Sequence, residues 1–531
     1  MRTAQTSCPA ATAPVAAYQR LEHGFDAVFG ARLNPWRHLG ALGFLFFWII
    51  AASGLYLYAV LDTSVDGAHR SISVLSREQW YFGGVLRSLH RYAADAFVVV
   101  TLLHLLREWL LGRYTGFRSF SWLTGVPLLW FIYISGSVGF WLRWDQLAQF
   151  SAVATAEWLD RLPLFATPLT RNFLSAAAVS DRLFSLFVFV HIGVPLLLIF
   201  GLWFHIQRIS RADVFPPRAL AAGSLLALLA LSLALPVASG AAADLSRVPG
   251  PLALDWFYLF PYPLMYATSS GVVWTLVAGV TLLLLILPAL PHGARAPIAE
   301  VHPNACNGCR RCFDDCPYAA IVMVPHPSGI PGRQLAQVIP RLCAGCGICA
   351  GSCPSSTPFR SVVELVTGID MPQMPIGKLK RALDQGLAQL EGETKIVVFG
   401  CDRGARVAQL AGTGVACVSL ICTGMLPPSF VEYALRSGAA GVLVSGCRAG
   451  GCAYRLGDRW TEERLAGARA PHLRESVPAE ALRIVWADRG EEAGLAAALA
   501  DFRKTLVRKR LIGADQIADR IVPSKWIPAR G

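Results

Sequence analysis

The chain has 531 residues, of which 54% are hydrophobic and only 16% are charged, and its mean hydropathy is +0.46. This composition excludes an ordinary soluble globular protein and is typical of a membrane domain joined to soluble domains. The net charge of +13 fits arginine-rich cytoplasmic loops, and no nucleic-acid recognition motif accompanies it, so we expect no nucleic-acid partner.

The first half of the chain carries the apolar sequence. Residues Tyr18–Gly30 predict a short amphipathic helix at the membrane surface, and no cleaved signal is evident before it. Six later runs are each close to the ~20 residues that cross a bilayer. They cover Leu39–Val60, Ser88–Leu111, Trp122–Trp141, Leu183–Ile206, Leu220–Gly240 and Gly271–Pro288. We therefore expect an all-α transmembrane bundle of six spans.

Arginines predict how this bundle is oriented. They cluster in the N-terminal flank and in the loops after the second and fourth spans, and positive loops stay in the cytoplasm. An even number of spans then puts the rest of the chain on the same side. The predicted location is the inner (cytoplasmic) membrane, with multiple spans and the cysteine-rich segments in the reducing cytoplasm.

Paired histidines are the sharpest feature of the membrane half. His90 and His104 lie fourteen residues apart in the second span, and His191 and His205 repeat this spacing in the fourth. Fourteen residues are nearly four helical turns, so each pair lies on one helix face, ~21 Å apart. Both helices run from outside to inside, which pairs His90 with His191 and His104 with His205. Two bis-histidine b-type haem sites are predicted; single histidines that only pack inside the membrane are the alternative.

Glycines and arginines support the haem interpretation. Gly40 and Gly54 in the first span repeat the spacing of fourteen, as do Gly125 and Gly139 in the third, where missing side chains would admit a porphyrin edge. Two arginines flank the histidines and are placed to pair with haem propionates, although ordinary membrane-flanking roles are equally open. They are Arg87 and Arg107.

Several of these motifs resemble cytochrome b of quinol-oxidising bc-type complexes. The motifs are residues 34–40 (NPWRHLG), 87–91 (RSLHR) and 134–141 (ISGSVGFW), together with both histidine helices. Residues 254–258 (LDWFY) resemble the Pro-Glu-Trp-Tyr motif of the outer quinol site, with Leu254 and Asp255 in place of Pro and Glu. The resemblance implies a quinone site with Asp255 as proton acceptor and Tyr258 as its neighbour.

A cysteine-rich stretch follows the membrane half. Its two halves, 37 residues apart, each read C-x2-C-x2-C-x3-C-P, the pattern that wraps a [4Fe–4S] cube. In this pattern the fourth cysteine of each half serves the other cube, which resembles a bacterial two-cluster ferredoxin. One predicted set is Cys306, Cys309, Cys312 and Cys353, and the other is Cys343, Cys346, Cys349 and Cys316. Zinc is the alternative, but zinc sites do not use two such octets with trailing proline.

The last segment reads as a small α/β domain with a mainly parallel sheet. Its β-rich runs are Lys395–Phe399, Val415–Ile421, Gly441–Ser445 and Leu482–Ala487, with helices at Ser429–Ser437 and Ala493–Arg508. Four cysteines follow strand ends, where such domains place their chemistry. They are Cys401, Cys422, Cys447 and Cys452, and they predict a [2Fe–2S] site, with buried packing cysteines as the alternative.

Residues 397–460 resemble the small iron–sulfur (delta) subunit that links hydrogenase to heterodisulfide reductase in methanogens. In that family the first cysteine belongs to a C-x2-C pair, and here Gly404 takes the second position, so the ligand set stays open and Cys417 is a possible substitute. Cys417 otherwise reads as a buried strand residue. No flavin or nicotinamide fingerprint follows a strand.

These readings give four segments: a cytochrome b-like domain (1–292), a two-[4Fe–4S] α+β ferredoxin domain (293–356), a linker with one helix (357–393), and the α/β iron–sulfur domain (394–531). We expect a membrane-bound electron-transfer subunit that works between the quinone pool and a soluble partner. The resemblance implies a heterodisulfide-reductase-like flavoprotein, a hydrogenase or a formate-dehydrogenase-type complex as that partner. The alternative is a membrane anchor and electron wire without its own quinone site.

Overall fold

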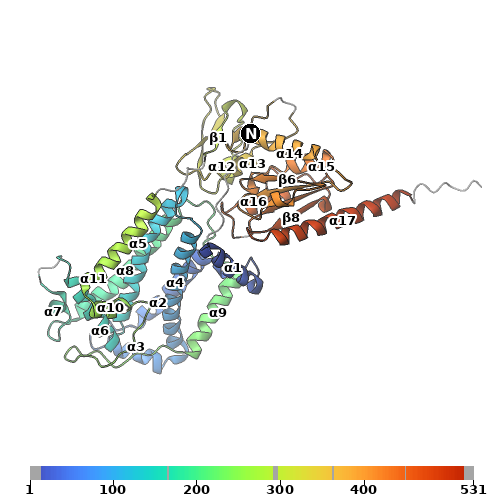
Figure 1. Cartoon of the computed structure of the whole chain (residues 1–531). Helices are drawn as coiled ribbons and strands as arrows, with labels where there is room; N and C mark the ends of the chain where they lie inside the picture. Colours follow the sequence, from blue (N-terminus) through green and yellow to red (C-terminus); the bar gives the residue numbers. More distant parts are fainter. Residues whose placement is uncertain (1–12, 164–166, 291–296, 361–363, 449, 519–531) are drawn as a thin grey trace, which may run out of the picture. The chain divides into compact units, whose positions relative to one another are not determined.

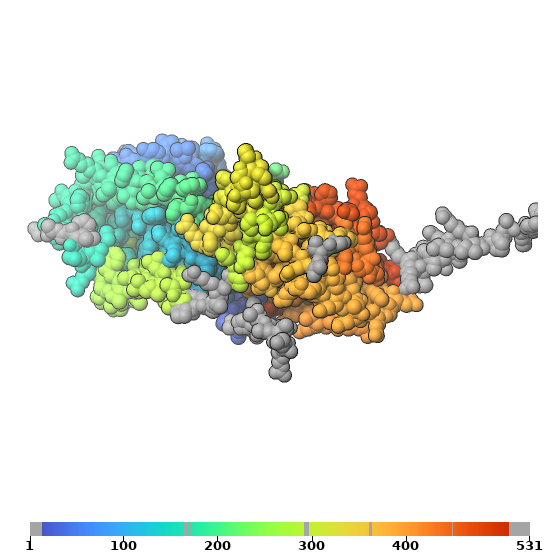
Figure 2. Space-filling model, turned by 90° about the horizontal axis from the view of Figure 1, so that it is seen from above, coloured from blue at the N-terminus to red at the C-terminus, as the bar shows by residue number. Residues whose placement is uncertain are grey.

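A computed structural model describes residues 13–163, 167–290, 297–360, 364–448 and 450–518. The chain forms two compact units, one of Met1–Arg208 with Ala212–Gly293 and one of Ile209–Arg211 with Ala294–Gly531. In Figure 1 the first unit runs from blue to yellow-green and the second from yellow to red, and Figure 2 shows the same colours on the molecular surface.

The regular elements of the first unit, over its described residues, are helices joined by loops. The surface helix expected near the N-terminus is α1 (Ala13–Phe29), and the six predicted spans are all helices. They are α2 (Leu39–Val60), α4 (Val85–Leu110), α5 (Ser119–Trp141), α8 (Asp181–Ile206), α9 (Arg218–Ala234) and α11 (Ser270–Ile286). Shorter helices fill the connections: α3 (Ala68–Arg77), α6 (Gln146–Asp160), α7 (Leu169–Phe173) and α10 (Pro261–Ala267).

Four of these helices are long and apolar enough to cross a membrane: Leu39–Val60, Gly116–Trp141, Asp181–Ile206 and Ser270–Ala289. Of the other two predicted spans, α4 is long enough at 26 residues but carries several charged residues, and α9 has only 17 residues. A helical membrane domain is therefore confirmed, whereas the count of six spans is not.

Two helix pairs build the centre of this unit. The most extensive packing joins α2 to α4 and α5 to α8, and α9 lies against α4. Buried leucine, phenylalanine and valine side chains from α2, α4, α5, α8 and α9 share one apolar core. This packing places the two histidine-bearing helices, α4 and α8, in the same bundle, each with a partner helix of its own.

The second unit begins with the segment that holds the two cysteine half-motifs, Cys306–Cys353, and that we call the dicluster segment. An antiparallel pair joins β1 (Glu300–Val301) to β4 (Ile369–Asp370), and a hairpin joins β2 (Ile321–Pro325) to β3 (Gln334–Val338). Two one-turn helices, α12 (Arg311–Asp315) and α13 (Ile348–Ser352), each carry the third cysteine of one half-motif. The internal repeat of the sequence thus becomes a repeat of loop, short helix and strand.

A four-stranded parallel sheet forms the remainder, as the sequence predicts. The strands β5 (Ile396–Cys401), β6 (Val415–Leu420), β7 (Gly441–Gly446) and β8 (Leu482–Trp486) lie in the order β6-β5-β7-β8. The helices α14 (Ile376–Ala388), α15 (Ser429–Arg436), α16 (Gly457–Leu465) and α17 (Glu492–Ala518) accompany the sheet. Parallel strands buried on both faces explain why β5 and β7 are continuous apolar runs.

The predicted linker between the two cysteine-rich parts is well ordered over its described residues. It supplies β4 to the dicluster segment and α14 to the face of β6, and α14 matches the single helix expected there. One hydrophobic core runs from Cys312 and Ile321 through Leu379 to Phe399 and Phe430. The dicluster segment and the α/β domain therefore form one packed body rather than two domains on a flexible tether.

Candidate redox sites

The four predicted haem histidines occupy matching positions on α4 and α8. The rings of His90 and His191 face each other with centroids 6.2 Å apart, and His104 and His205 lie within electrostatic range of each other. Since imidazole–metal bonds are about 2 Å long, one ion fits between the first pair of rings. The structure brings together the two pairs expected from the fourteen-residue spacing.

A glycine faces each of these imidazoles. A Cβ atom on Gly139 would lie 2.7 Å from Cε1 of His191, and on Gly54 it would lie 3.0 Å from Cε1 of His90. Gly125 and Gly40 stand in the same relation to His205 and His104, at 3.2 and 3.6 Å. An imidazole ring is therefore the neighbour that crowds a side chain at Gly139, Gly54 and Gly125, whereas the distance at Gly40 is an ordinary contact. Direct contact of these glycines with a porphyrin edge stays a prediction.

Hydrogen bonds fix which histidine nitrogen is free. Nδ1 of His90 lies 3.0 Å from the carbonyl oxygen of Ile50, and Nδ1 of His191 lies 2.9 Å from that of Ser135. Nδ1 of His205 lies 3.2 Å from the hydroxyl of Thr124. When Nδ1–H donates to such an acceptor, Nε2 keeps its lone pair for a metal. The donor set thus fits axial ligation of haem iron.

A cavity of about 500 Å³ adjoins the first histidine pair. It is lined by His90 and His191, by Gly54 and Gly139, and by Arg87 at one end. Its wall is mostly apolar, as a porphyrin pocket must be. The cavity and the flanking imidazoles together fit one haem, and the bound haem would supply one-electron oxidation and reduction there.

The two arginines predicted to meet propionates have different surroundings. Arg87 donates to the hydroxyls of Ser76 and Ser239, the latter at 2.7 Å, and it reaches the cavity. Arg107 instead forms an ion pair with Glu22 on α1 at 3.1 Å and another with Glu108 at 3.4 Å. Arg87 can still take a propionate, whereas Arg107 already neutralises carboxylates of the protein.

Tyr258 lies in the cavity of the His90–His191 pair, and Asp255 begins the turn that leads to it. One oxygen of Asp255 accepts the backbone N–H groups of Phe257 and Tyr258, and its other oxygen pairs with Arg91 on α4. The ring of Tyr258 occupies the space above Gly136, where a Cβ would lie 2.0 Å away. Tyr258 therefore lines the cavity, whereas Asp255 is reached through Arg91, which also lines it, and its carboxylate is engaged rather than free.

Arg91 is a site residue that the sequence reading missed. It bridges Asp255 to Asp95, one turn further along α4, and its guanidinium lies 4.8 Å from the ring centroid of Phe140. A charged triplet inside an otherwise apolar bundle usually has a function. The i, i+4 spacing of Arg91 and Asp95 was visible in the sequence, but their pairing with Asp255 across the bundle was not.

The eight dicluster cysteines surround two enclosed voids. Cys306, Cys309, Cys312 and Cys353 line one void, and Cys316, Cys343, Cys346 and Cys349 line the other. Each void thus receives three cysteines from one half-motif and the fourth from the other half, as the crossed pattern predicts. Burial raises the pKa of Cys312 to about 12 and that of Cys349 well above its usual value, so these thiols stay protonated until a metal displaces the protons. The donors fit two iron–sulfur cubes, which would supply one-electron transfer.

Four cysteines of the α/β domain also meet. Cys401 ends β5, Cys422 and Cys447 follow β6 and β7, and Cys452 comes from the loop after β7. Hydrogen bonds from the thiols of Cys422 and Cys447 hold the pKa of Cys401 well below its usual value, and Cys452 contacts Cys422. Four converging thiols at the carboxyl edge of a parallel sheet fit a metal cluster.

The structure does not bring Cys417 to this set. Cys417 lies within β6 and packs against a separate apolar cluster that includes Leu495 and Phe502. Gly404 has no room for a cysteine either, since a Cβ there would lie 2.9 Å from the carbonyl oxygen of Ala487 and 3.0 Å from the carbonyl carbon of Gly446. Neither position adds a ligand to the four thiols.

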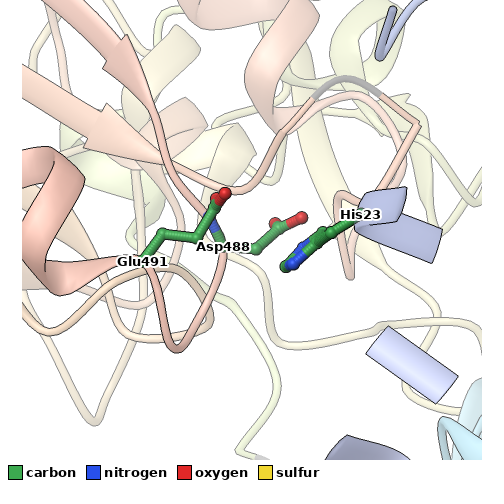
Figure 3. A group of neighbouring side chains, drawn as sticks. All are labelled: His23, Asp488 and Glu491. Carbon is green, nitrogen blue, oxygen red and sulfur yellow. The ribbon is translucent and has the colours of Figure 1, made fainter. Parts of the chain in front are cut away.

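Acidic residues hold the loop that carries Cys447. Asp488 and Glu491, drawn in Figure 3, both bind Arg448, the next residue after Cys447. The backbone N–H of Arg448 donates to Asp488 at 3.0 Å, and its guanidinium Nε donates to Glu491 at 2.8 Å. Glu491 also accepts the N–H of Asp488 at 2.7 Å. The sequence reading missed these residues because the contact joins β7 to the end of β8.

Comparison with known families confirms the three predicted resemblances. Residues 25–212 match cytochrome b/b6/petB, residues 305–357 match the 4Fe-4S dicluster domain, and residues 396–508 match the delta subunit of methyl-viologen-reducing hydrogenase. Among solved structures, a chain of a hyperthermophilic respiratory Complex III is similar over 48% of this chain and 75% of its own, with 21% identity and a TM-score of 0.39. The cytochrome b and dicluster matches support a membrane electron-transfer role, with haem and iron–sulfur clusters as its cofactors.

Proposed function

We propose that this protein is the membrane subunit of an oxidoreductase complex, carrying electrons between the quinone pool and a cytoplasmic flavin or iron–sulfur enzyme. The observation that carries the proposal is the presence of four separate ligand sets in one chain: two histidine pairs and two cubane cysteine sets, with four further thiols beyond them. Two b haems, two [4Fe–4S] clusters and one [2Fe–2S] cluster are the proposed cofactors.

The protein's own residues position these groups. Nδ1 hydrogen bonds orient His90 and His191, and Arg87 offers a cation at one end of their cavity. The apolar wall around the cavity keeps water away, which lowers the local dielectric and strengthens the pairing of charges. The location proposed is the inner (cytoplasmic) membrane, with the cysteine-rich unit in the cytoplasm.

The proposed soluble partner follows from the last domain. Its similarity to a hydrogenase delta subunit favours a hydrogenase, a formate-dehydrogenase-type enzyme or a heterodisulfide-reductase-like flavoprotein. The four thiols beside Arg448 would form the exchange point with that enzyme. A protein that co-purifies with the full chain and carries flavin or nickel would identify the partner class.

Quinone would react beside Tyr258 and the Arg91–Asp255 pair. A buried hydrogen-bonded tyrosine and an ion pair that can release a carboxylate offer a donor and a proton acceptor there. One observation favours the second candidate, an anchor and wire without its own quinone site: both oxygens of Asp255 are already engaged.

Replacement of the carboxylate separates the two candidates. Asp255→Asn keeps an oxygen that can cap the turn but loses the charge, so quinone-dependent reoxidation of reduced haem should slow ~100-fold or more, the usual contribution of one acid–base group. Asp244→Asn, in an exposed loop of the same unit, is the control and should have no effect. An unchanged rate of quinone-dependent haem reoxidation in Asp255→Asn, at full haem content, would favour the second candidate, the anchor without its own quinone site.

A further inference from the structure

In the second unit, one dicluster cysteine set lies next to the α/β thiols. Cys346 of the first set and Cys452 of the second lie within electrostatic range of each other. Tyr454 lies within the same range of Cys346 and of Cys422. Tyr454 therefore lies near a cysteine of both sets.

The two sets also approach through the backbone. The helix α13 carries Cys349, and the single turn η7 (Thr423–Met425) begins directly after Cys422. A Cβ on Gly351 in α13 would lie 2.3 Å from the carbonyl oxygen of Gly424 in this turn. A Cβ on Gly424 would in turn lie 2.9 Å from Cγ1 of Ile348. Only glycines allow the segments that follow Cys349 and Cys422 to touch.

A third glycine continues this contact on the α/β side. A Cβ on Gly457, at the start of α16, would lie 2.2 Å from Sγ of Cys422 and 3.3 Å from Sγ of Cys452. In the other direction, a Cβ on Gly424 would lie 3.1 Å from Cα of Gly457. Glycines therefore line the whole path from α13 to the thiols of Cys422 and Cys452.

One buried arginine holds these segments together. Arg464, whose side chain is 1% exposed, donates from Nη1 to the carbonyl oxygen of Gly424 at 2.7 Å. Its Nη2 donates to the carboxylate of Asp315 and, at 2.7 Å, to the hydroxyl of Ser352. Asp315 directly precedes Cys316, and Ser352 directly precedes Cys353. A single rigid guanidinium therefore fixes three ligand-bearing segments through two of its nitrogens.

The carboxylate at the centre of this network is fully satisfied. Asp315 also accepts a hydrogen bond from Ser352 at 2.8 Å and pairs with Arg469 at 2.6 Å, and its backbone carbonyl accepts the indole N–H of Trp460 at 3.0 Å. Buried ion pairs contribute little net stability but fix one arrangement of the chain, because any other leaves a buried charge unpaired. Such a network is suited to holding a distance constant.

We propose that the contact between α13 and η7 is the electron-transfer bridge between the Cys316–Cys343–Cys346–Cys349 site and the four thiols of the α/β domain, with Arg464 as its positioning residue. The step moves one electron: it leaves the centre at one cysteine set and enters the centre at the other. No bond forms or breaks and no proton is transferred. The bridge rests on the proposed function in that both sets must hold clusters.

The test compares Arg464→Met with Arg469→Met in the cluster-loaded full chain. Both substitutions remove an arginine from Asp315, but only Arg464 also holds Gly424. EPR of the reduced protein should show magnetic interaction between the two centres in the wild type and in Arg469→Met. In Arg464→Met the magnetic interaction should weaken at unchanged iron content, and electron exchange between the centres should slow, because the rate of electron tunnelling falls exponentially with the distance between them.

Other outcomes overturn the bridge. Independent EPR signals in the iron-complete wild type would exclude it, as would an unchanged interaction in iron-complete Arg464→Met. Equal loss of iron from both variants would assign Arg464 a purely structural role. If Arg464→Met does not assemble, Gly351→Ala replaces it, because its added Cβ pushes directly on Gly424. A wild type without iron at the α/β thiols would instead refute the cluster of the proposed function, and iron and sulfide analysis identifies that case separately.

Discussion

At the scale of single residues, the Nδ1 hydrogen bond decides the chemistry of three buried histidines, His90, His191 and His205. The carbonyl groups of Ile50 and Ser135 take the Nδ1 side of His90 and His191, so Nε2 of both rings is left for a metal. The glycine opposite each ring is equally specific, because the imidazole fills the volume that a side chain would need. The fourteen-residue spacings predicted both pairs and their glycines, since helix geometry is local and regular.

Adding a side chain at one of these glycines should remove one haem. Gly139→Val places a branched side chain where Cε1 of His191 already lies 2.7 Å from the Cβ position, so the ring must move. Haem content of the purified chain should fall from two to one. Gly193→Val on α8, where nothing lies within 4 Å, is the matched control and should keep both. Full haem content in Gly139→Val would contradict this reading of the glycine.

The ion pairs at this scale could not be predicted. Arg107 was expected to meet a propionate because it lies one turn from His104, yet it pairs with Glu22 from α1. Arg91 was passed over, yet it joins Asp95 to Asp255. The Arg107–Glu22 and Arg91–Asp255 pairs join segments far apart in the chain, and such partners depend on packing that no local pattern encodes.

At the scale of elements, the repeat of the cysteine motif becomes two sites with exchanged fourth ligands. Each short helix delivers one cysteine to its own void and lies next to the cysteine that serves the other void. The motif predicted this crossing because the spacing is characteristic. The strand-end cysteines of the α/β domain were predictable too, since carboxyl ends of parallel strands share an edge. Only the packing of the sheet showed that the positions of Cys417 and Gly404 do not supply a ligand to the four thiols.

Paired substitutions test the exchange of fourth ligands. Cys353→Ser should abolish the cluster of Cys306, Cys309 and Cys312, because one iron loses its thiolate. The double variant Cys353→Ser/Cys309→Ser should then lose no more iron than either single variant. In contrast, Cys353→Ser/Cys346→Ser should lose both cubes. Iron and sulfide analysis decides between them, and the reverse pattern would show that each half-motif binds its own cube.

Cluster removal should also destabilise the second unit. The cysteine sites lie inside the apolar core shared by the dicluster segment and the α/β domain, and Cys349 is buried in it. Empty sites leave the core with voids, and metal binding contributes directly to folding in such small segments. Treatment with an iron chelator under oxidising conditions should lower the melting temperature of the second unit and leave that of the first unit constant. Calorimetry measures both transitions. An unchanged second transition would argue against this coupling.

At the scale of the whole molecule, the chain joins a helical membrane unit to one compact cysteine-rich unit. The three family resemblances were predictable from the sequence. Residues 357–393 were interpreted as a linker. Their β4 and α14 instead complete the dicluster and α/β parts, and pairing over long sequence separations explains why this was hidden. The count of six spans stays a prediction, because α4 carries several charged residues and α9 has only 17 residues.

The central claim is that one chain conducts electrons between its membrane unit and its cysteine-rich unit. The most direct measurement mixes the fully reduced, cofactor-loaded chain with an oxidised quinone analogue and follows haem absorbance and the EPR signals of the clusters together. The proposed function predicts that haems and clusters are all oxidised, because electrons leave the clusters through the haems to the quinone. Haems that oxidise while the clusters stay reduced would contradict it.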